Sequence, residues 1–154
     1  MTAEERPVRI LHVEDNIGDV RLVAEALKES GRRYEVAVAA DGVEALDYLH
    51  KRGDYSRAPT PDVILLDLNL PRRGGLEVLT EIKSVLELQN IPVVVFTSSA
   101  APLDINRAYR ARASCYVTKP ADLGELFRVM GVIEKLWLVA AKLPADCIAI
   151  PTPD

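Results

Sequence analysis

Short apolar runs alternate with helix-like segments along this chain of 154 residues. The clearest run is Val63–Leu66, which lies between Pro61 and Pro71 and predicts a strand buried on both faces. Because segments with apolar residues at helical spacing separate the runs, we expect an α/β fold, a doubly wound parallel sheet with helices on both faces. The other predicted strands are residues 8–13, 34–39, 91–96 and 114–117.

Capping residues and apolar spacing set the expected helix boundaries. Asn16 or Asp15 is expected to cap the first helix. The third helix is predicted over residues 76–88, with Leu86 facing inward. The last two helices are predicted at about residues 102–111 and 122–141.

Composition and charge argue against several classes of protein. The net charge of −4 argues against binding to nucleic acid or to an anionic membrane. Cys115 and Cys147 lack the CxxC spacing of a zinc site and are too few for a disulfide scaffold. The polar N-terminus lacks the apolar core of a signal peptide, and no apolar run approaches the ~20 residues of a spanning helix. We therefore expect one soluble, cytoplasmic domain.

Polar residues follow four of the predicted strands. Glu14 and Asp15 follow the first strand, Asp67 the third, Thr97 the fourth and Lys119 the last. The carboxyl ends of parallel strands meet at one edge of a sheet, where ligands bind. Taken singly, Asp67 could cap a turn and the acidic pair could be solvated. Their convergence on one edge is hard to explain by packing alone.

These residue types fit phosphoryl transfer. Three carboxylates offer the hard oxygen ligands that Mg²⁺ prefers, and the metal would relieve their mutual repulsion. A carboxylate such as Asp67 can attack phosphorus and form an aspartyl-phosphate. Lys119 would supply positive charge and Thr97 a hydroxyl donor to the phosphoryl oxygens. His12, inside the first strand, is expected to be a core or interface residue rather than a ligand.

This combination of motifs resembles the receiver domain of response regulators, the CheY-like family of two-component signalling. The resemblance covers about residues 8–137 and includes Pro71, four residues after Asp67, and the pair Lys119-Pro120. It implies a flavodoxin-like, five-stranded sheet of order 2-1-3-4-5. It also implies a cis peptide bond between Lys119 and Pro120.

The resemblance further implies a role for each residue at the sheet edge. Asp67 is the expected phosphoacceptor. The backbone carbonyl of Asn69 is expected to join three carboxylates in binding Mg²⁺, those of Glu14, Asp15 and Asp67. The expected phosphoryl-binding and switch residues are Thr97, Lys119 and Tyr116, the last an aromatic ring that turns inward on phosphorylation.

The function implied by the resemblance is a stand-alone phosphorylation switch rather than a turnover enzyme. The chain would accept a phosphoryl group from a histidine kinase, change its conformation and partner binding, and lose the group by slow autodephosphorylation. Residues 53–75 are similar to single-domain regulators partnered with phytochrome-type histidine kinases. The first helix, near Ile17 and Val20, is the expected kinase-docking surface.

Two other functions are open at this point. A metal-dependent phosphohydrolase of the haloacid-dehalogenase type would also use Asp67 as a transient nucleophile, but its acid–base carboxylate is missing because position 69 is Asn. A nucleotide- or flavin-binding protein of similar topology is disfavoured because no GxGxxG or GxxxxGK[ST] loop follows the first strand.

The last predicted helix carries two apolar stripes, whereas a helix that covers a sheet needs one. The stripe from Leu123 to Trp137 is expected to pack on the sheet. We predict a receiver domain at residues 1–141 and a tail at 142–154 that docks on the partner subunit of a dimer. The second stripe, a predicted homodimer surface, consists of Val129, Val132, Leu136 and Val139.

Overall fold

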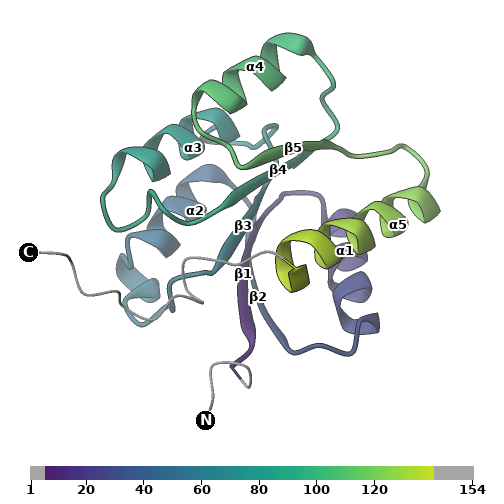
Figure 1. The fold of residues 1–154 in the computed structure, drawn as a ribbon. Helices are drawn as coiled ribbons and strands as arrows, with labels where there is room; N and C mark the ends of the chain where they lie inside the picture. Colours follow the sequence, from purple (N-terminus) through teal and green to yellow (C-terminus); the bar gives the residue numbers. More distant parts are fainter. Residues whose placement is uncertain (1–5, 141–154) are drawn as a thin grey trace, which may run out of the picture.

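The computed structural model describes residues 6–140. The five strands in this part of the chain form one parallel sheet (Figure 1). The strand order is β2-β1-β3-β4-β5, as the family resemblance implies. The sheet is therefore doubly wound, and its order reverses between β1 and β3. The strands are β1 (Val8–Val13), β2 (Tyr34–Ala39), β3 (Val63–Leu66), β4 (Val93–Thr97) and β5 (Cys115–Thr118).

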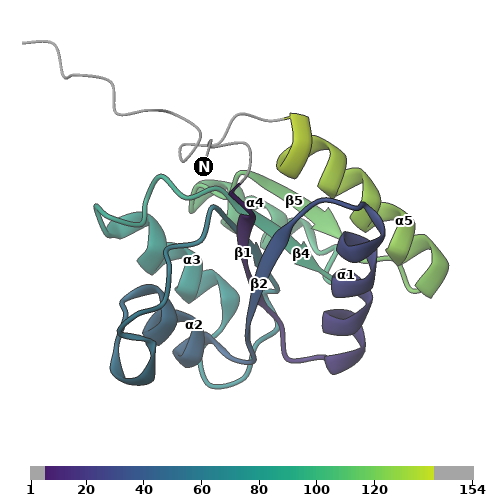
Figure 2. The ribbon, with the colours of Figure 1, turned by 90° about the horizontal axis from the view of Figure 1, so that it is seen from below.

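Helices cover both faces of the sheet. Helices α1 and α5 lie side by side on one face, and α2, α3 and α4 cover the other (Figures 1 and 2). A short 3₁₀ turn, η2, follows α2, and a π-helical segment, η3, continues α5. The bounds are α1 (Ile17–Glu29), α2 (Gly42–Leu49), η2 (Gly53–Tyr55), α3 (Gly75–Ser84), α4 (Pro102–Arg110), α5 (Leu123–Ile133) and η3 (Glu134–Ala140).

The alternation of side chains along the strands divides the core into two clusters. Leu11 and Val13 of β1 face the helices α2 to α4, whereas Ile10 faces α1 and α5. All four residues of β3 are buried, which confirms the prediction of a strand covered on both faces. Burial of this apolar surface is the main favourable term that holds the layers together.

Helix α1 begins at one of its two predicted caps, and α5 is capped in the same manner. The side chain of Asn16 accepts a hydrogen bond from the backbone of Asp19 and caps α1. Asp122 caps α5 in the same way through the backbone of Glu125. Each bond satisfies a backbone N–H group that has no partner within its helix.

Two predictions about helix faces are wrong. Helix α3 ends at Ser84 instead of residue 88, so Leu86 lies in the following turn and is 75% exposed rather than inward-facing. Leu123 is the first residue of α5 and is 68% exposed, although it shares the stripe of buried Leu126 and Met130. In both cases the apolar spacing extends beyond the part of the helix that covers the sheet.

The start of α3 lies very close to the backbone that follows β3. A Cβ atom added to Gly75 would lie 2.3 Å from the carbonyl oxygen of Asp67 and 2.6 Å from the Cα of Leu68. The backbone N–H of Gly75 donates to the carbonyl of Leu68 at 3.0 Å. This contact fixes the loop between β3 and α3 against the helix, and it needs a residue without a Cβ.

None of the helices within residues 6–140 combines the length and the apolar character needed to cross a lipid bilayer.

Candidate functional site

The backbone hydrogen bonds of the sheet continue into the residues that follow the strands. Glu14 donates to the carbonyl of Ala39 at 2.9 Å, and Asp67 donates to that of Val13 at 3.0 Å. Lys119 donates to the carbonyl of Thr97 at 2.7 Å. The side chains at this edge are thus held by rigid strand ends rather than by free loops.

Three carboxylates converge at this edge, as predicted. Glu14, Asp15 and Asp67 each offer an oxygen atom, and these atoms lie within 4.8 Å of one another. Glu14 and Asp67 are buried, whereas Asp15 is exposed and leaves the group open to solvent on one side. A set of hard oxygen donors with an open side fits Mg²⁺ or a similar divalent cation, which keeps several water ligands.

The ammonium group of Lys119 lies among the acidic side chains. Its Nζ atom is 2.7 Å from Glu14 Oε2, 2.9 Å from Asp19 Oδ2 and 3.3 Å from Asp67 Oδ2. The same atom lies 5.9 Å from the ring centre of Phe96, within the range of a cation–π contact. Burial alone would lower the pKa of Lys119, but the bonds to Glu14 and Asp19 outweigh it and raise the pKa. The residue therefore stays charged.

Asp67 accepts several hydrogen bonds that favour its ionised form. Its Oδ1 atom accepts from the Thr97 hydroxyl at 2.6 Å and from the backbone N–H of Asn69 at 3.2 Å. Burial raises the pKa of Asp67, but the bond from Thr97 and the charge of Lys119 outweigh this and lower it. Asp67 is thus a charged carboxylate available as a nucleophile.

Glu14 behaves in the opposite way. Burial, reinforced by the negative charge of Asp67, raises the pKa of Glu14 to about 7, although the bond from Lys119 opposes the rise. Its Oε1 atom accepts from the backbone N–H of Asn16 at 3.1 Å. A cation bound between Glu14 and Asp67 would replace the proton and stabilise the charged form of Glu14.

Tyr116 points inward. Its ring packs against the core cluster under α2 to α4, and its hydroxyl donates to the backbone carbonyl of Ser99 at 2.7 Å. The hydroxyl of Ser99 donates in turn to Asp104 at 2.6 Å, which links the loop after β4 to helix α4. The predicted switch residue therefore contacts the segment that follows Thr97.

The predicted cis bond at Lys119-Pro120 is wrong, because no cis peptide occurs among residues 6–140. A trans bond is the favoured form of a peptide before proline.

Sequence reasoning missed Asp19 as a member of this site. Asp19 lies in the first turn of α1, the helix that begins directly after the acidic pair, and this position was the available signal.

His12 was predicted to be a core residue, and this is confirmed: it is almost fully buried. Burial, and secondarily the charge of Lys119, lowers the pKa of His12 to about 4. Its Nδ1 atom has no hydrogen-bond partner within the described part of the chain.

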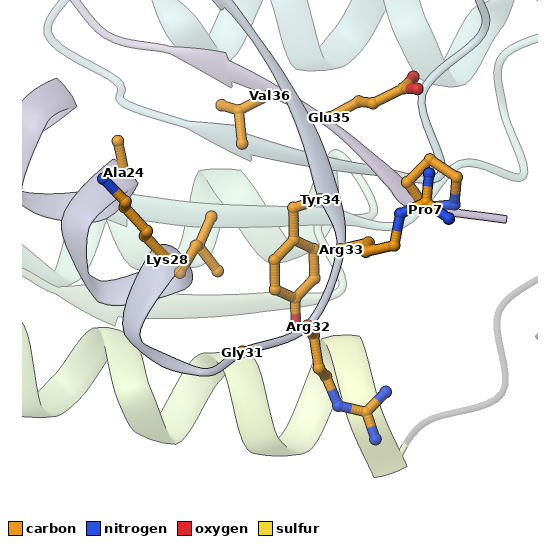
Figure 3. A pocket seen from close by; sticks show the side chains of 10 residues that line it. Pro7, Ala24, Lys28, Gly31, Arg32, Arg33, Tyr34, Glu35 and Val36 are labelled. Carbon is orange, nitrogen blue, oxygen red and sulfur yellow. The ribbon is translucent and has the colours of Figure 1, made fainter. Parts of the chain in front are cut away.

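A separate hollow lies at the opposite edge of the sheet, between the end of α1 and the start of β2 (Figure 3). Lys28, Arg32 and Tyr34 are among its lining residues. Because all strands are parallel, this edge is the farthest from the carboxylates, and the hollow is not part of the site.

Comparison with known proteins identifies the family. Residues 10–130 match the response regulator receiver domain. The chain belongs to the response regulator receiver family. It is 44% identical over 146 residues to response regulator Rcp1 of Synechocystis sp., covering 94% of this chain and 99% of Rcp1.

Two solved receiver structures are closely similar. One is the phosphorylated cyanobacterial phytochrome response regulator RcpA, with a TM-score of 0.88 and 47% identity over 90% of this chain and 99% of RcpA. The other is the Mn²⁺-bound form of Rcp1, with a TM-score of 0.87 and 44% identity over 90% of this chain and 99% of that one. The phosphohydrolase and nucleotide-binding alternatives find no support in these relatives.

The exposed stripe of α5 is only partly as predicted. Val132 and Leu136 are 54% and 57% exposed, so they do form an apolar surface. Val129 is half-buried and packs against the cluster under α1 and α5. The side chain of Val139 lies outside the described part of the receiver, as does the whole predicted tail at residues 142–154.

Proposed function

We propose that this receiver accepts a phosphoryl group on Asp67 from the phosphohistidine of a histidine kinase. One observation carries the proposal. The ionised Asp67 lies among the hydroxyl of Thr97, the ammonium of Lys119 and two further carboxylates, all at the carboxyl edge of a parallel sheet. Each of these groups serves phosphoryl transfer, which needs positioning and charge stabilisation more than covalent help.

In the proposed reaction, an oxygen atom of Asp67 forms a bond to phosphorus while the bond between phosphorus and the imidazole nitrogen breaks. The electron pair of the broken bond returns to the imidazole. Lys119 balances the charge that develops on the phosphoryl oxygens, and the hydroxyl of Thr97 donates to one of them. Thr97 and Lys119 contact Asp67 before the reaction, so little reorganisation is required.

Glu14, Asp15, Asp67 and the backbone carbonyl of Asn69 would hold Mg²⁺. When bound, the metal supplies positive charge that draws the phosphoryl oxygens to the site and neutralises them. The N–H of Asn69 donates to Asp67 at 3.2 Å, which places the backbone of Asn69 beside the carboxylates. The Mn²⁺-bound form of the similar protein Rcp1 supports a divalent cation as the ligand of these carboxylates.

The output is a change of conformation and not a released product. Thr97 and Tyr116 lie on neighbouring strands, and Tyr116 is bonded to Ser99, two residues after Thr97. A phosphoryl group that binds the Thr97 hydroxyl would therefore act on the same loop that Tyr116 contacts. Slow autodephosphorylation would return the receiver to its starting state.

The proposed donor is a phytochrome-type histidine kinase. The name of RcpA, a phytochrome response regulator, supports this assignment. Ile17 is 67% exposed on α1, beside the carboxylates, and is the proposed centre of the kinase-docking surface. A cytoplasmic location belongs to this proposal, because a kinase needs ATP to form its phosphohistidine.

The proposal also includes a homodimer. In it, Val132 and Leu136 of the receiver domain, residues 1–141, would pack against a second copy, with Val129 and Val139 at the border of the contact. The tail at residues 142–154 would extend this contact onto the partner.

The phosphoacceptor is tested by the intact mass of the protein after incubation with acetyl phosphate, a small-molecule donor, with and without Mg²⁺. We expect one phosphoryl adduct that requires Mg²⁺ and is absent from the variant Asp67→Asn. Asp47→Asn, at a partly exposed acid on α2, is the matched control and should be phosphorylated like the wild type.

The outcomes separate the parts of the proposal. An adduct of equal yield on Asp67→Asn would show that another residue accepts the group. A folded wild-type protein that gains no adduct from either acetyl phosphate or a phytochrome-type kinase would overturn the proposed function.

A further inference from the structure

The ammonium of Lys119 has as many carboxylate partners as it has N–H groups. An ammonium carries three donors. Glu14, Asp19 and Asp67 accept them at 2.7, 2.9 and 3.3 Å, and the Lys119 side chain is only 7% exposed. The position of the charge is therefore set by these three bonds and not by water.

Two of the three partners change their role in the proposed reaction. Asp67 gains the phosphoryl group, and Glu14 is one of the three carboxylates that converge to hold a cation. Asp19 is not part of that converging group. The bond between Asp19 and Lys119 can therefore remain in place when the cation binds and when the phosphoryl group is transferred.

Helix α1 holds Asp19 in place for this contact. Asp19 lies in the first turn, and its backbone N–H donates to the capping side chain of Asn16 at 3.1 Å. Its carboxylate points back to the edge of the sheet and is partly buried. A negative charge in the first turn is also favoured by the helix dipole.

We propose that Asp19 is a positioning residue that holds the ammonium of Lys119 beside Asp67 while the phosphoryl group is transferred. This inference rests on the proposed function. Without Asp19, one N–H of Lys119 would lack its carboxylate partner, and the ammonium would be less constrained when the cation draws on Glu14. Misplacement of a charge by about 1 Å is enough to slow a reaction that depends on preorganised electrostatics.

The test is the rate of phosphorylation by acetyl phosphate at saturating Mg²⁺, followed by intact mass. We expect the variant Asp19→Asn to react about tenfold more slowly than the wild type, a difference that one misplaced charge can produce. Asp19→Glu, which returns the carboxylate on a longer side chain, should recover most of the rate. Glu25→Gln removes an exposed charge from the same helix and should react at the wild-type rate.

A double-mutant cycle separates positioning from a general effect of charge or stability. If Asp19 acts through Lys119, then Asp19→Asn should have no further effect on the rate in a Lys119→Met background. Thermal unfolding of each variant, measured without Mg²⁺, checks that all of them are folded at the assay temperature.

The outcomes are distinct. A wild-type rate for Asp19→Asn, or the same loss of rate in the Lys119→Met background, would overturn the role of Asp19 and leave Asp67 as phosphoacceptor. A wild-type protein that cannot be phosphorylated would overturn the proposed function, and this inference with it.

Discussion

At the scale of single residues, His12 shows how the acidic site affects the core beneath it. The ring is buried in β1, and its pKa of about 4 lies well below the usual 6.5 because of burial and the nearby Lys119. Between these two values the unfolded chain binds a proton that the folded protein does not. The free energy of unfolding should therefore fall as the pH falls from 6.5 towards 4, by about 3 kcal/mol from this residue alone.

The chain contains two histidines, so a spectrum of protein with ¹³C-labelled histidine has only two ring signals to assign. We expect the His12 signal to keep its neutral position down to pH 5. The variant His12→Leu should lose less stability than the wild type between pH 7 and pH 5 in urea unfolding. A His12 signal that titrates with a midpoint near 6.5 would refute this account.

At the same scale, the sequence predicted some site residues correctly and missed another. The polar residues that form the site at the carboxyl ends of β1, β3, β4 and β5 were found, because a parallel sheet brings the ends of its strands to one edge. Asp19 was missed because its role depends on the angle at which α1 leaves the sheet. Helical spacing shows which residues share a face, but it does not show what that face meets.

At the scale of elements, the contact between α3 and the loop after β3 positions Asp67. In the variant Gly75→Ala, the new methyl group would meet the backbone of Asp67 and Leu68, and backbone atoms cannot move aside as a side chain can. We expect a loss of about 2 kcal/mol or more in the free energy of unfolding and weaker Mg²⁺ binding, because Asp67 would shift.

Gly74→Ala is the matched control for this variant. A Cβ atom on Gly74 would meet no heavy atom of residues 6–140 within 4 Å, and its φ of −67° suits alanine. Urea unfolding and Mg²⁺ titration should therefore be close to wild type for Gly74→Ala and impaired for Gly75→Ala. Equal behaviour of the two variants would show that the close approach has no energetic consequence.

A partly buried hydrogen bond joins β2 to the junction between α5 and η3. The hydroxyl of Tyr34, whose ring is seen in Figure 3, donates to Oε1 of buried Glu134 at 2.7 Å. Tyr34→Phe would leave this carboxylate without its donor, at a cost of about 1–3 kcal/mol. We expect faster amide hydrogen exchange in residues 134–140 than in the wild type.

Tyr55→Phe is the control for Tyr34→Phe. It removes a hydroxyl that donates to Glu44 at 2.9 Å, a contact between η2 and α2. Its effect on exchange should be confined to that region. Unchanged exchange at residues 134–140 in Tyr34→Phe would show that packing alone holds η3.

At the scale of the whole molecule, the order of strands and helices could be predicted, because the periods of apolar residues differ between the two kinds of element. The pairing order came from the family resemblance, since periodicity alone does not specify which strands are neighbours. The end of α3 and the buried face at the start of α5 were predicted less accurately. Beyond α3 the apolar pattern continues into Leu86, which the sheet no longer covers, and at the start of α5 it includes Leu123, which the sheet does not yet cover.

The last prediction concerns assembly. Val132 and Leu136 are four residues apart, lie on one side of the helical segment formed by α5 and η3, and remain exposed although the helix already covers the sheet with its other side. Burial of two such side chains on each copy is favourable, whereas a carboxylate at either position would be costly to desolvate.

We expect the wild type to sediment as a dimer at high concentration. The double variant that combines Val132→Asp with Leu136→Asp should sediment as a monomer. Leu86→Asp, at a still more exposed apolar position beyond α3 on the other face of the sheet, should remain dimeric. A wild type that stays monomeric, both alone and after treatment with acetyl phosphate and Mg²⁺, would rule out this surface as a homodimer contact.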